Sequence, residues 1–390
     1  MIRRDRWIPY AVAAAYLAVG AWRVWPAAAV IRDGLPTYAY YLWSYRHGAY
    51  SDLVALYVVR DLYLHRLPYV AAPLEYPPVI GMVLWATAWM PGLGGYLAAN
   101  ILLLAAGVFA TVALAEAVRG PAAARAWAFS PLLAVYAVYN WDVLGLVTWG
   151  LAAWAGARRR YGWAGWWVGV GVATKLFPVV LLPYWLAERA AARDGRGAAA
   201  LVGGSAAAAV GLNAPFAWAN YANWSQFWRY NSTRGPDPGF WQWLWLRTGL
   251  SVPAIDALSL AVVAAGGLVL AAAVWRRRLE PLQAAALALA WWFLWNKVYS
   301  PQYMVWVLYA LVLAEPPGTV LRVLLNAAGL LDFGLAMAWL ATGTAGSPLE
   351  TLVGTVIAPW VILLRDGAFL GTFLAAGRNR IPVPASSGRR

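Results

Sequence analysis

Two lysines stand where a charged side chain is costly. Of the 30 Lys and Arg residues only Lys175 and Lys297 are Lys, and each lies in a strongly apolar stretch with a proline three or four residues later. An ionisable side chain at membrane depth costs a few kcal/mol, so it usually has a functional partner. A proline ends a helix and leaves unpaired backbone groups that can line a polar cavity. Each ammonium is therefore predicted to bind an anion, the alternative being that it reaches the lipid headgroups.

Three acidic residues in one hydrophilic stretch are candidates for a catalytic carboxylate: Asp52, Asp61 and Glu75. On one continuous helix Asp52 and Asp61 would point to opposite faces, whereas Asp61 and His65 would share a face. A shared carboxylate pair is therefore not expected. We predict that one acid acts as a general base, while the other pairs with Arg60 or His65.

Residue types exclude several other catalytic centres. The chain has no Cys and only two His, His47 and His65, both in the same hydrophilic stretch. This excludes a disulfide framework, a thiolate metal site and a Cys nucleophile, and argues against a His-built metal site or a Ser-His-Asp triad. A phosphate-binding Gly-rich loop that ends in Lys and Ser or Thr is also absent. No metal-ligating set is predicted, and the question of a divalent metal stays open.

The elements that must position these residues are membrane helices. Hydrophobic residues make up 63% of the 390 residues and charged residues 12%, against about 45–50% and about 25% in ordinary globular proteins. The net charge of +14 comes largely from cations clustered between apolar runs, as in the cytoplasmic loops of membrane proteins. No basic stripe interleaves with aromatic residues, so nucleic-acid binding is not expected. The predicted fold class is an all-α polytopic membrane protein.

Apolar runs indicate where the chain crosses the bilayer, for which a helix needs about 20 mostly apolar residues. The candidate runs are 8–24, 96–118, 126–141, 143–157, 198–214, 251–275, 281–296, 299–314, 319–341 and 350–376. If the basic clusters all lie on one side, two further runs do not alternate. We predict a re-entrant half-helix at 77–91 and a helical hairpin at 162–187, broken near Thr174 to Pro178; the alternative is two ordinary spans.

Two long hydrophilic stretches, 25–76 and 215–250, then lie on the outer side. Both are longer than a connection requires and are rich in Tyr or Trp, which favour the headgroup level of a membrane. Within the first, Ser51 to Arg66 is predicted to form an interfacial helix with Ser51 as its N-cap. Residues 377–390 are predicted to form a disordered cytoplasmic tail.

Several short motifs, taken in order, resemble those of a known enzyme class. They are Asp52-Leu-Val-Ala-Leu-Tyr57 with Leu67-Pro-Tyr69 and Glu75-Tyr-Pro-Pro78, then Ser130-Pro131 through Asn140-Trp-Asp142, then Ala173-Thr-Lys-Leu-Phe-Pro178, and Asn296-Lys-Val-Tyr-Ser-Pro-Gln-Tyr303. Over residues 8 to 315 the chain resembles GT-C glycosyltransferases, in particular the polyprenyl-phosphate-mannose-dependent mannosyltransferases of glycosyltransferase family 87. It is more distantly similar to the catalytic subunit of GPI mannosyltransferase I. That enzyme has Asp-x-Asp where this chain reads Tyr50-Ser51-Asp52, which weakens a metal-binding role for the loop.

The resemblance implies a fold and an activity. The expected fold is one transmembrane GT-C-like domain over residues 1–376, a bundle of about 10 to 13 transmembrane helices with broken or re-entrant segments. The expected location is the cell membrane, with the active site on the extracytoplasmic side. The expected reaction transfers a sugar, mannose by the resemblance, from a polyprenyl-phosphate donor to a glycolipid or glycan hydroxyl by one inverting displacement, without a cofactor.

This chemistry gives the candidate residues their expected roles. Asp52 is expected to be the general base that takes the proton of the acceptor hydroxyl. Lys297 is expected to stabilise the leaving phosphate. Further donor-phosphate ligands are expected to be Lys175, Gln302, Tyr303, Asn296 and Arg229. The substrate pocket is expected to include Glu75, Tyr76, Tyr57, His65 and Asp142.

Two other function classes stay open at this point. Broken helices and buried lysines also occur in transporters, so a transporter or flippase of a lipid-linked sugar is the main alternative. Against it, the segments around Lys175 and Lys297 show no inverted repeat, because their flanks do not match. A non-catalytic scaffold subunit is the third possibility, and it would leave Asp52 without a purpose.

Overall fold

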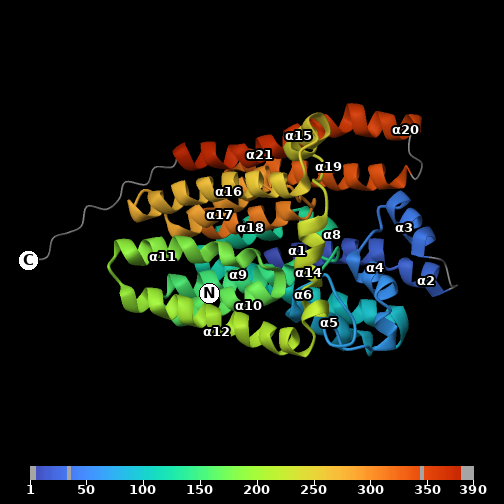
Figure 1. Ribbon diagram of the computed structural model, residues 1–390, viewed down its shortest axis with the longest axis horizontal. Helices are drawn as coiled ribbons and strands as arrows, with labels where there is room; N and C mark the ends of the chain where they lie inside the picture. The colour runs from blue at the N-terminus through green and yellow to red at the C-terminus, as the bar shows by residue number, and fades with distance from the viewer. Residues whose placement is uncertain (1–5, 33–36, 343–346, 379–390) are drawn as a thin grey trace, which may run out of the picture.

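The computed structural model describes residues 6–32, 37–342 and 347–378 (Figure 1). These residues form helices and no β-strand, and one isolated bridge joins Pro68 and Ala72. The first half contains α1 (Ile8–Val24), α2 (Ala27–Arg32), α3 (Thr37–Arg46), α4 (Asp52–Val59), η1 (Leu62–Leu64), α5 (Pro78–Ala88), α6 (Gly92–Arg119), α7 (Pro121–Ala128), α8 (Leu132–Tyr136), α9 (Asp142–Ala157), α10 (Tyr161–Lys175), η2 (Phe177–Val180) and α11 (Leu181–Ala191). The second half contains α12 (Gly195–Ala219), α13 (Tyr221–Trp224), α14 (Gln226–Thr233), α15 (Phe240–Thr248), α16 (Val252–Trp275), α17 (Pro281–Trp295), α18 (Tyr303–Ala314), α19 (Thr319–Ala341), α20 (Pro348–Thr351), η3 (Leu352–Ile357) and α21 (Ala358–Arg378). Residues 379–390 of the expected tail lie outside the described residues.

The prediction of an all-α polytopic membrane protein is confirmed. Six described segments are long and apolar enough to cross a membrane: Ile8–Ile31, Gly92–Arg119, Gly195–Ala219, Val252–Trp275, Thr319–Ala341 and Pro348–Gly377. Shorter apolar helices, namely α5, α9, α17 and α18, lie among them. The described residues thus combine six candidate spans with four shorter apolar helices, and the total of about 10 to 13 transmembrane helices stays a prediction.

One expected span, 126–141, is wrong. The helix α7 ends at Ala128 and the short α8 begins at Leu132, with a turn between them. Pro131 explains the break, because proline lacks a backbone donor and disfavours a helical conformation in the residue before it. The apolar composition of this run therefore reflects burial in the bundle and not a crossing helix.

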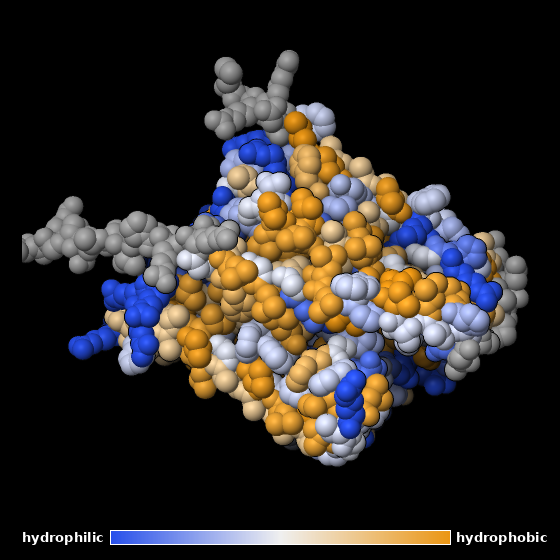
Figure 2. Space-filling model, turned by 90° about the horizontal axis from the view of Figure 1, so that it is seen from above, coloured by the Kyte–Doolittle hydropathy of each residue, from blue (hydrophilic) through white to orange (hydrophobic). Residues whose placement is uncertain are grey.

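The basic clusters gather at one end of the bundle. Four contacts join them: Arg277 donates to the Ala191 carbonyl at 3.4 Å, Arg119 pairs with Glu280 at 2.6 Å, Arg6 lies 3.7 Å from Glu116, and the Arg189 guanidinium lies 4.4 Å from the centre of the Tyr161 ring. On the face in Figure 2, hydrophobic side chains cover most of the middle and hydrophilic ones gather toward the two ends. This arrangement is that of a protein with an apolar belt between two wet surfaces.

The predicted hairpin at 162–187 is confirmed. The helix α10 runs away from the basic end, η2 reverses the chain, and α11 returns, so that Arg189 meets Tyr161 near the start of α10. The break lies at Leu176, which has a φ of 61°, a left-handed conformation that ends the helix. The run 77–91 contains α5, whose 11 residues measure about 17 Å. Its half-helix length is therefore confirmed.

Glycines bring α10 and α12 into close contact. A Cβ added at Gly165 would collide with the Leu201 carbonyl, and one added at Gly169 would collide with the Ser205 carbonyl. Small residues allow helix backbones to approach closely in membranes, where van der Waals contact is a main source of helix association. This interface fixes α10, and with it Lys175 at its end.

Replacing Gly169 by Ala is therefore expected to destabilise the protein by about 1–3 kcal/mol, because the added methyl group meets backbone atoms that cannot move aside. Thermal unfolding in detergent, followed by tryptophan fluorescence, measures the effect. Gly203→Ala is the matched control on α12, since a Cβ there meets nothing within 4 Å. Equal melting temperatures for the two variants would contradict the close-contact interpretation.

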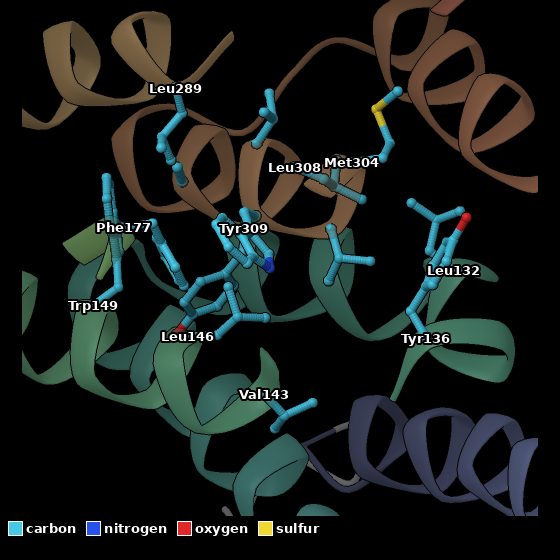
Figure 3. Close-up of a cluster of buried hydrophobic side chains, with 14 of the residues drawn as sticks. Leu132, Tyr136, Val143, Leu146, Trp149, Phe177, Leu289, Met304, Leu308 and Tyr309 are labelled. Atoms are coloured by element: carbon cyan, nitrogen blue, oxygen red, sulfur yellow. The ribbon is translucent and has the colours of Figure 1, made fainter. Parts of the chain in front are cut away.

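A buried apolar cluster fills the middle of the bundle (Figure 3). It joins Val143, Leu146 and Trp149 of α9 to Leu289 of α17 and to Met304, Leu308 and Tyr309 of α18. Phe177 of η2 enters the same cluster, where its ring stacks 4.1 Å from that of Trp306. The cluster therefore holds the ends of α9, α10 and α18 in fixed positions relative to one another.

The first hydrophilic stretch folds differently from the expected helix over Ser51 to Arg66. Ser51 is the N-cap, as predicted, but α4 ends at Val59. Asp61 and His65 both have positive φ values, 47° and 55°, and so interrupt the helix. The expectation that they share a helical face is wrong for this reason, and Asp61 instead accepts a hydrogen bond from Tyr63 at 2.8 Å.

Candidate active site

A cavity of about 490 Å³ opens among the ends of several helices. Its wall includes Asp52 at the start of α4, Lys175 at the end of α10, Asp256 near the start of α16 and Lys297 just after α17. The other ends of α10, α16 and α17 lie at the basic clusters. The cavity therefore lies at the end of the bundle opposite those clusters.

Asp52 is fixed by the cap of α4. The Ser51 hydroxyl oxygen accepts a hydrogen bond from the backbone N–H of Leu53 at 3.2 Å and lies 2.8 Å from the Val138 carbonyl, to which it donates. The backbone N–H of Asp52 donates to the Tyr139 carbonyl at 2.8 Å. These hydrogen bonds attach the N-terminus of α4 to the segment just before α9. They therefore hold Asp52 at the cavity wall.

Two tyrosines hold the Asp52 carboxylate. Tyr50 donates to its Oδ1 at 2.8 Å and Tyr76 donates to its Oδ2 at 2.6 Å. Burial raises the pKa of the Asp52 carboxyl above its ordinary value, while the hydrogen bonds from Tyr76 and Tyr50 and the charge of Lys175 lower it. Burial also raises the pKa of both tyrosines well above the ordinary value, so they remain donors at neutral pH.

Lys175 also belongs to the cavity wall, but it is paired with a different acid. Its Nζ is 2.5 Å from Asp142 Oδ1 and 4.3 Å from the centre of the Tyr76 ring. The other oxygen of Asp142 accepts a hydrogen bond from Trp306 Nε1 at 2.9 Å. Asp142 is 2% exposed and is not among the residues of the cavity wall. The ion pair therefore supports Tyr76, which in turn contacts Asp52.

Lys297 lies at another part of the cavity wall with its side chain 5% exposed. Its Nζ is 2.8 Å from Asp256 Oδ1, and it donates to the carbonyls of Arg234 at 2.9 Å and Ser232 at 3.4 Å. These carbonyls lie at and just after the end of α14. Lys297 therefore joins three segments that are distant in sequence.

The segment after α14 is tied to the segment after α17. Arg234 pairs with Asp237 at 2.7 Å, and the Asp237 carboxylate accepts the backbone N–H of Tyr299 at 2.9 Å. The backbone N–H of Asp237 donates to the Lys297 carbonyl at 2.8 Å. Figure 1 shows α14 crossing the ends of the long helices. Because Trp228 and Tyr230 of α14 belong to the cavity wall, α14 covers one side of the cavity.

The remaining expected residues fall into two groups. The structure brings Glu75, Tyr76, Asn296, Gln302 and Tyr303 into the cavity wall. Glu75 there accepts a hydrogen bond from Arg60 at 2.9 Å, so Arg60 pairs with Glu75 and not with Asp61 as one expectation had it. The Oε1 of Gln302 is buried and has no hydrogen-bond partner among the described residues.

The second group lies away from the cavity. Tyr57 is buried with its ring 4.8 Å from that of Tyr96, and His65 stacks on Trp89 at 4.2 Å. Arg229 is exposed on α14 and is not part of the cavity wall. The cation that α14 brings to the wall is instead Arg234, one residue past the helix end.

Sequence reasoning did not single out Asp256 or Arg234. Asp256 follows the N-cap Ser251 by five residues and lies at the start of an otherwise apolar helix, so the argument that drew attention to the lysines applies to it equally. Within the described residues, no group of three or more His, Cys, Asp or Glu side chains is arranged to hold a metal ion.

Comparison with known proteins identifies the family of the chain. The model of glycosyltransferase family 87 matches residues 74–301, which is more than half of the chain. The match includes Tyr76, Asp142, Lys175 and Lys297, and Asp52 precedes it. No curated protein matches the chain. The chain therefore belongs to glycosyltransferase family 87 and is a membrane glycosyltransferase.

Proposed function

We propose that this glycosyltransferase moves a sugar from a polyprenyl-phosphate donor to a glycolipid or glycan hydroxyl, with mannose as the sugar that the resemblance favours. The observation that carries the proposal is that Asp52 and Lys297 line one cavity. A carboxylate and a fixed ammonium are the two charges that this reaction needs. Family membership favours transfer over transport as the task of this cavity.

The carboxylate takes the proton. As the acceptor oxygen attacks the anomeric carbon of the donor sugar, its hydroxyl proton passes to Asp52. A general base in this position raises the reaction rate by about 10²–10⁴-fold. The bond between the anomeric carbon and the phosphate oxygen breaks on the opposite side, so the configuration inverts. Tyr50 and Tyr76 hold the carboxylate in position through the bonds described above.

The ammonium stabilises the leaving group. Negative charge rises on the lipid phosphate as the bond to the sugar breaks, so a fixed cation in a site with little water binds the transition state more strongly than the ground state. Lys297 supplies this charge. Neutral hydrogen-bond donors lie on both sides of it in the chain: Asn296 precedes it, and Gln302 and Tyr303 follow it. All three belong to the same cavity wall. Arg234 is a second cation within the wall.

The location of the cavity supports an extracytoplasmic active site. Basic clusters in short loops favour the cytoplasmic side of a membrane, and here they gather at the end opposite the cavity. The donor tail would lie among the apolar helices while its phosphate reaches Lys297. A lipid-linked donor also explains why no nucleotide-binding loop is needed.

Lys175 is proposed to adjust the base and not to bind the donor phosphate, because Asp142 already neutralises it. Besides burial, the pKa of the Asp52 carboxyl depends on the hydrogen bonds from Tyr76 and Tyr50 and on two charges: Lys175 lowers this pKa and Asp142 raises it. Lys175→Met is therefore expected to move the acid limb of the rate profile to higher pH, because the base then ionises later.

Asp142→Asn gives the matched control for this prediction. Removing the acid takes away a charge that raises the pKa of Asp52, so the acid limb is expected to move to lower pH. Measuring kcat/KM from pH 4 to 9 for both variants separates this role from a purely structural one. Lower rates with unshifted limbs in both variants would contradict it.

The proposed function itself is tested with purified protein in detergent. Supplied with a prenyl-phosphate mannose and an acceptor glycolipid, the enzyme is expected to form a new glycosidic bond and release prenyl phosphate. Transfer needs no sealed membrane, whereas flipping has no meaning in a micelle. Absence of product from any prenyl-phosphate sugar, together with transfer from a nucleotide sugar, would overturn the proposed donor class.

A further inference from the structure

The ammonium of Lys297 has no free donor. A lysine carries three N–H groups, and three oxygens lie within hydrogen-bond reach of this Nζ: Asp256 Oδ1 at 2.8 Å, the Arg234 carbonyl at 2.9 Å and the Ser232 carbonyl at 3.4 Å. The side chain is 5% exposed, so water supplies little further contact. A phosphate can therefore reach this ammonium only if one of the three oxygens leaves.

The three oxygens are not held equally. The two carbonyls belong to the backbone near the end of α14. The contacts of Asp237 with Arg234 and Tyr299 hold this part of the backbone in place. The Asp256 side chain is 37% exposed and lies in the cavity wall. Among the described residues it makes no hydrogen bond or ion pair other than that with Lys297. A rotation about its side-chain bonds releases it without moving any helix.

We propose that Asp256 occupies the place of the donor phosphate on Lys297, and that exchange of this carboxylate for the phosphate sets the affinity for the lipid donor. The inference rests on the proposed function, since it takes Lys297 to be the phosphate ligand. Asp256 is thus a residue that determines affinity and not one that touches the reacting atoms. The carboxylate keeps the buried ammonium paired whenever no donor is bound, which avoids the cost of an uncompensated buried charge.

The same carboxylate favours release of the product. The donor phosphate is a diester with one negative charge, whereas the prenyl phosphate left after transfer is a monoester that carries about −1.5 to −2 at neutral pH. Asp256 lies beside either group and repels the more highly charged one more strongly. It therefore weakens binding of product more than binding of donor.

The test is equilibrium binding of decaprenyl phosphate to the full-length protein in detergent, with decaprenol as the uncharged probe of the same tail. Asp256→Asn is expected to bind decaprenyl phosphate about tenfold more tightly than the wild type, because no carboxylate competes for Lys297. Its affinity for decaprenol is expected to stay unchanged. In steady state the KM for donor and kcat are both expected to fall, because product leaves more slowly.

Two further variants make the outcome decisive. Asp61→Asn removes the same charge outside the cavity and keeps a residue that tolerates the positive φ at that position, so its affinity should equal that of the wild type. Unchanged or weaker binding of decaprenyl phosphate by Asp256→Asn overturns the exchange. If Lys297→Met binds decaprenyl phosphate as tightly as the wild type, the proposed donor site is wrong, and that result is independent of the Asp256 variant.

Discussion

Replacing Asp52 by Asn is expected to lower sugar transfer by about 10²–10⁴-fold while leaving affinity for the lipid donor close to that of the wild type. An amide of the same shape fills the space of the carboxylate but cannot take the proton of the acceptor hydroxyl. Asp52 is the first residue of α4, and the N-cap is Ser51. Because the Asp52 side chain does not cap the helix, the substitution leaves the helix start intact. Initial rates with purified enzyme and saturating donor measure the change.

Asp61→Asn is the control for charge, because Asp61 contacts Tyr63 and lies outside the cavity wall. We expect it to transfer sugar at the wild-type rate. If the Asp52→Asn enzyme did so as well, Asp52 would not be the base, and Glu75, the other carboxylate that the first hydrophilic stretch brings to the cavity wall, would be the next residue to test.

Replacing Lys297 by Met is expected to weaken binding of the lipid phosphate and to lower turnover by about 10²–10³-fold. Methionine is similar to lysine in length and keeps its apolar stem, but it removes the positive charge. The stabilisation that this charge provides grows as negative charge develops on the leaving phosphate. Both donor binding and single-turnover rates should be measured, since the charge acts more strongly on the transition state than on the bound donor.

Arg229→Met gives the comparison for this second experiment. The sequence placed Arg229 among the expected phosphate ligands, whereas the structure leaves it exposed on α14 and outside the cavity wall. Its loss is therefore expected to change donor affinity little. A donor affinity that survives in Lys297→Met would instead make Lys297 a structural link between the end of α14 and the segment after α17.

The residues that could be found from sequence are those whose type conflicts with their surroundings. Lys175 and Lys297 are charged within apolar runs, and both prove to line the cavity. The helix cap at Ser51 and the hairpin break near Pro178 were also predictable, because both depend on residues adjacent in the chain. Local chemistry therefore indicated residues that the structure brings to one cavity.

The partners could not be found in the same way. Lys175 pairs with Asp142, 33 positions earlier in the chain, because the packing of α9 against α10 brings them together. Arg234 and not Arg229 reaches the cavity because α14 ends at Thr233. Gly235 and Pro236 mark this helix end in the sequence, but they do not show which of the nearby cations faces the cavity. Asp61 and His65 adopt positive φ values, which the helical pattern of the surrounding residues does not indicate. Pairings across helices depend on register and tilt, which one sequence does not specify.

The unequal lengths of the helices have a consequence for how the enzyme meets its substrate. The 12 residues of α18 and the 15 of α17 measure about 18 and 23 Å, whereas the 28 of α6 measure about 42 Å. The candidate site lies at the ends of the short helices. Because α6 and α17 share the basic end of the bundle, α6 extends further than α17 on the other side, and the site is sunk below the far end of α6. A prenyl carrier would arrive sideways, by diffusion within one leaflet, and its mole fraction among the surrounding lipids would govern the rate. Adding inert lipid at constant bulk carrier concentration should accordingly slow the enzyme, because the carrier is then diluted within the plane of the membrane.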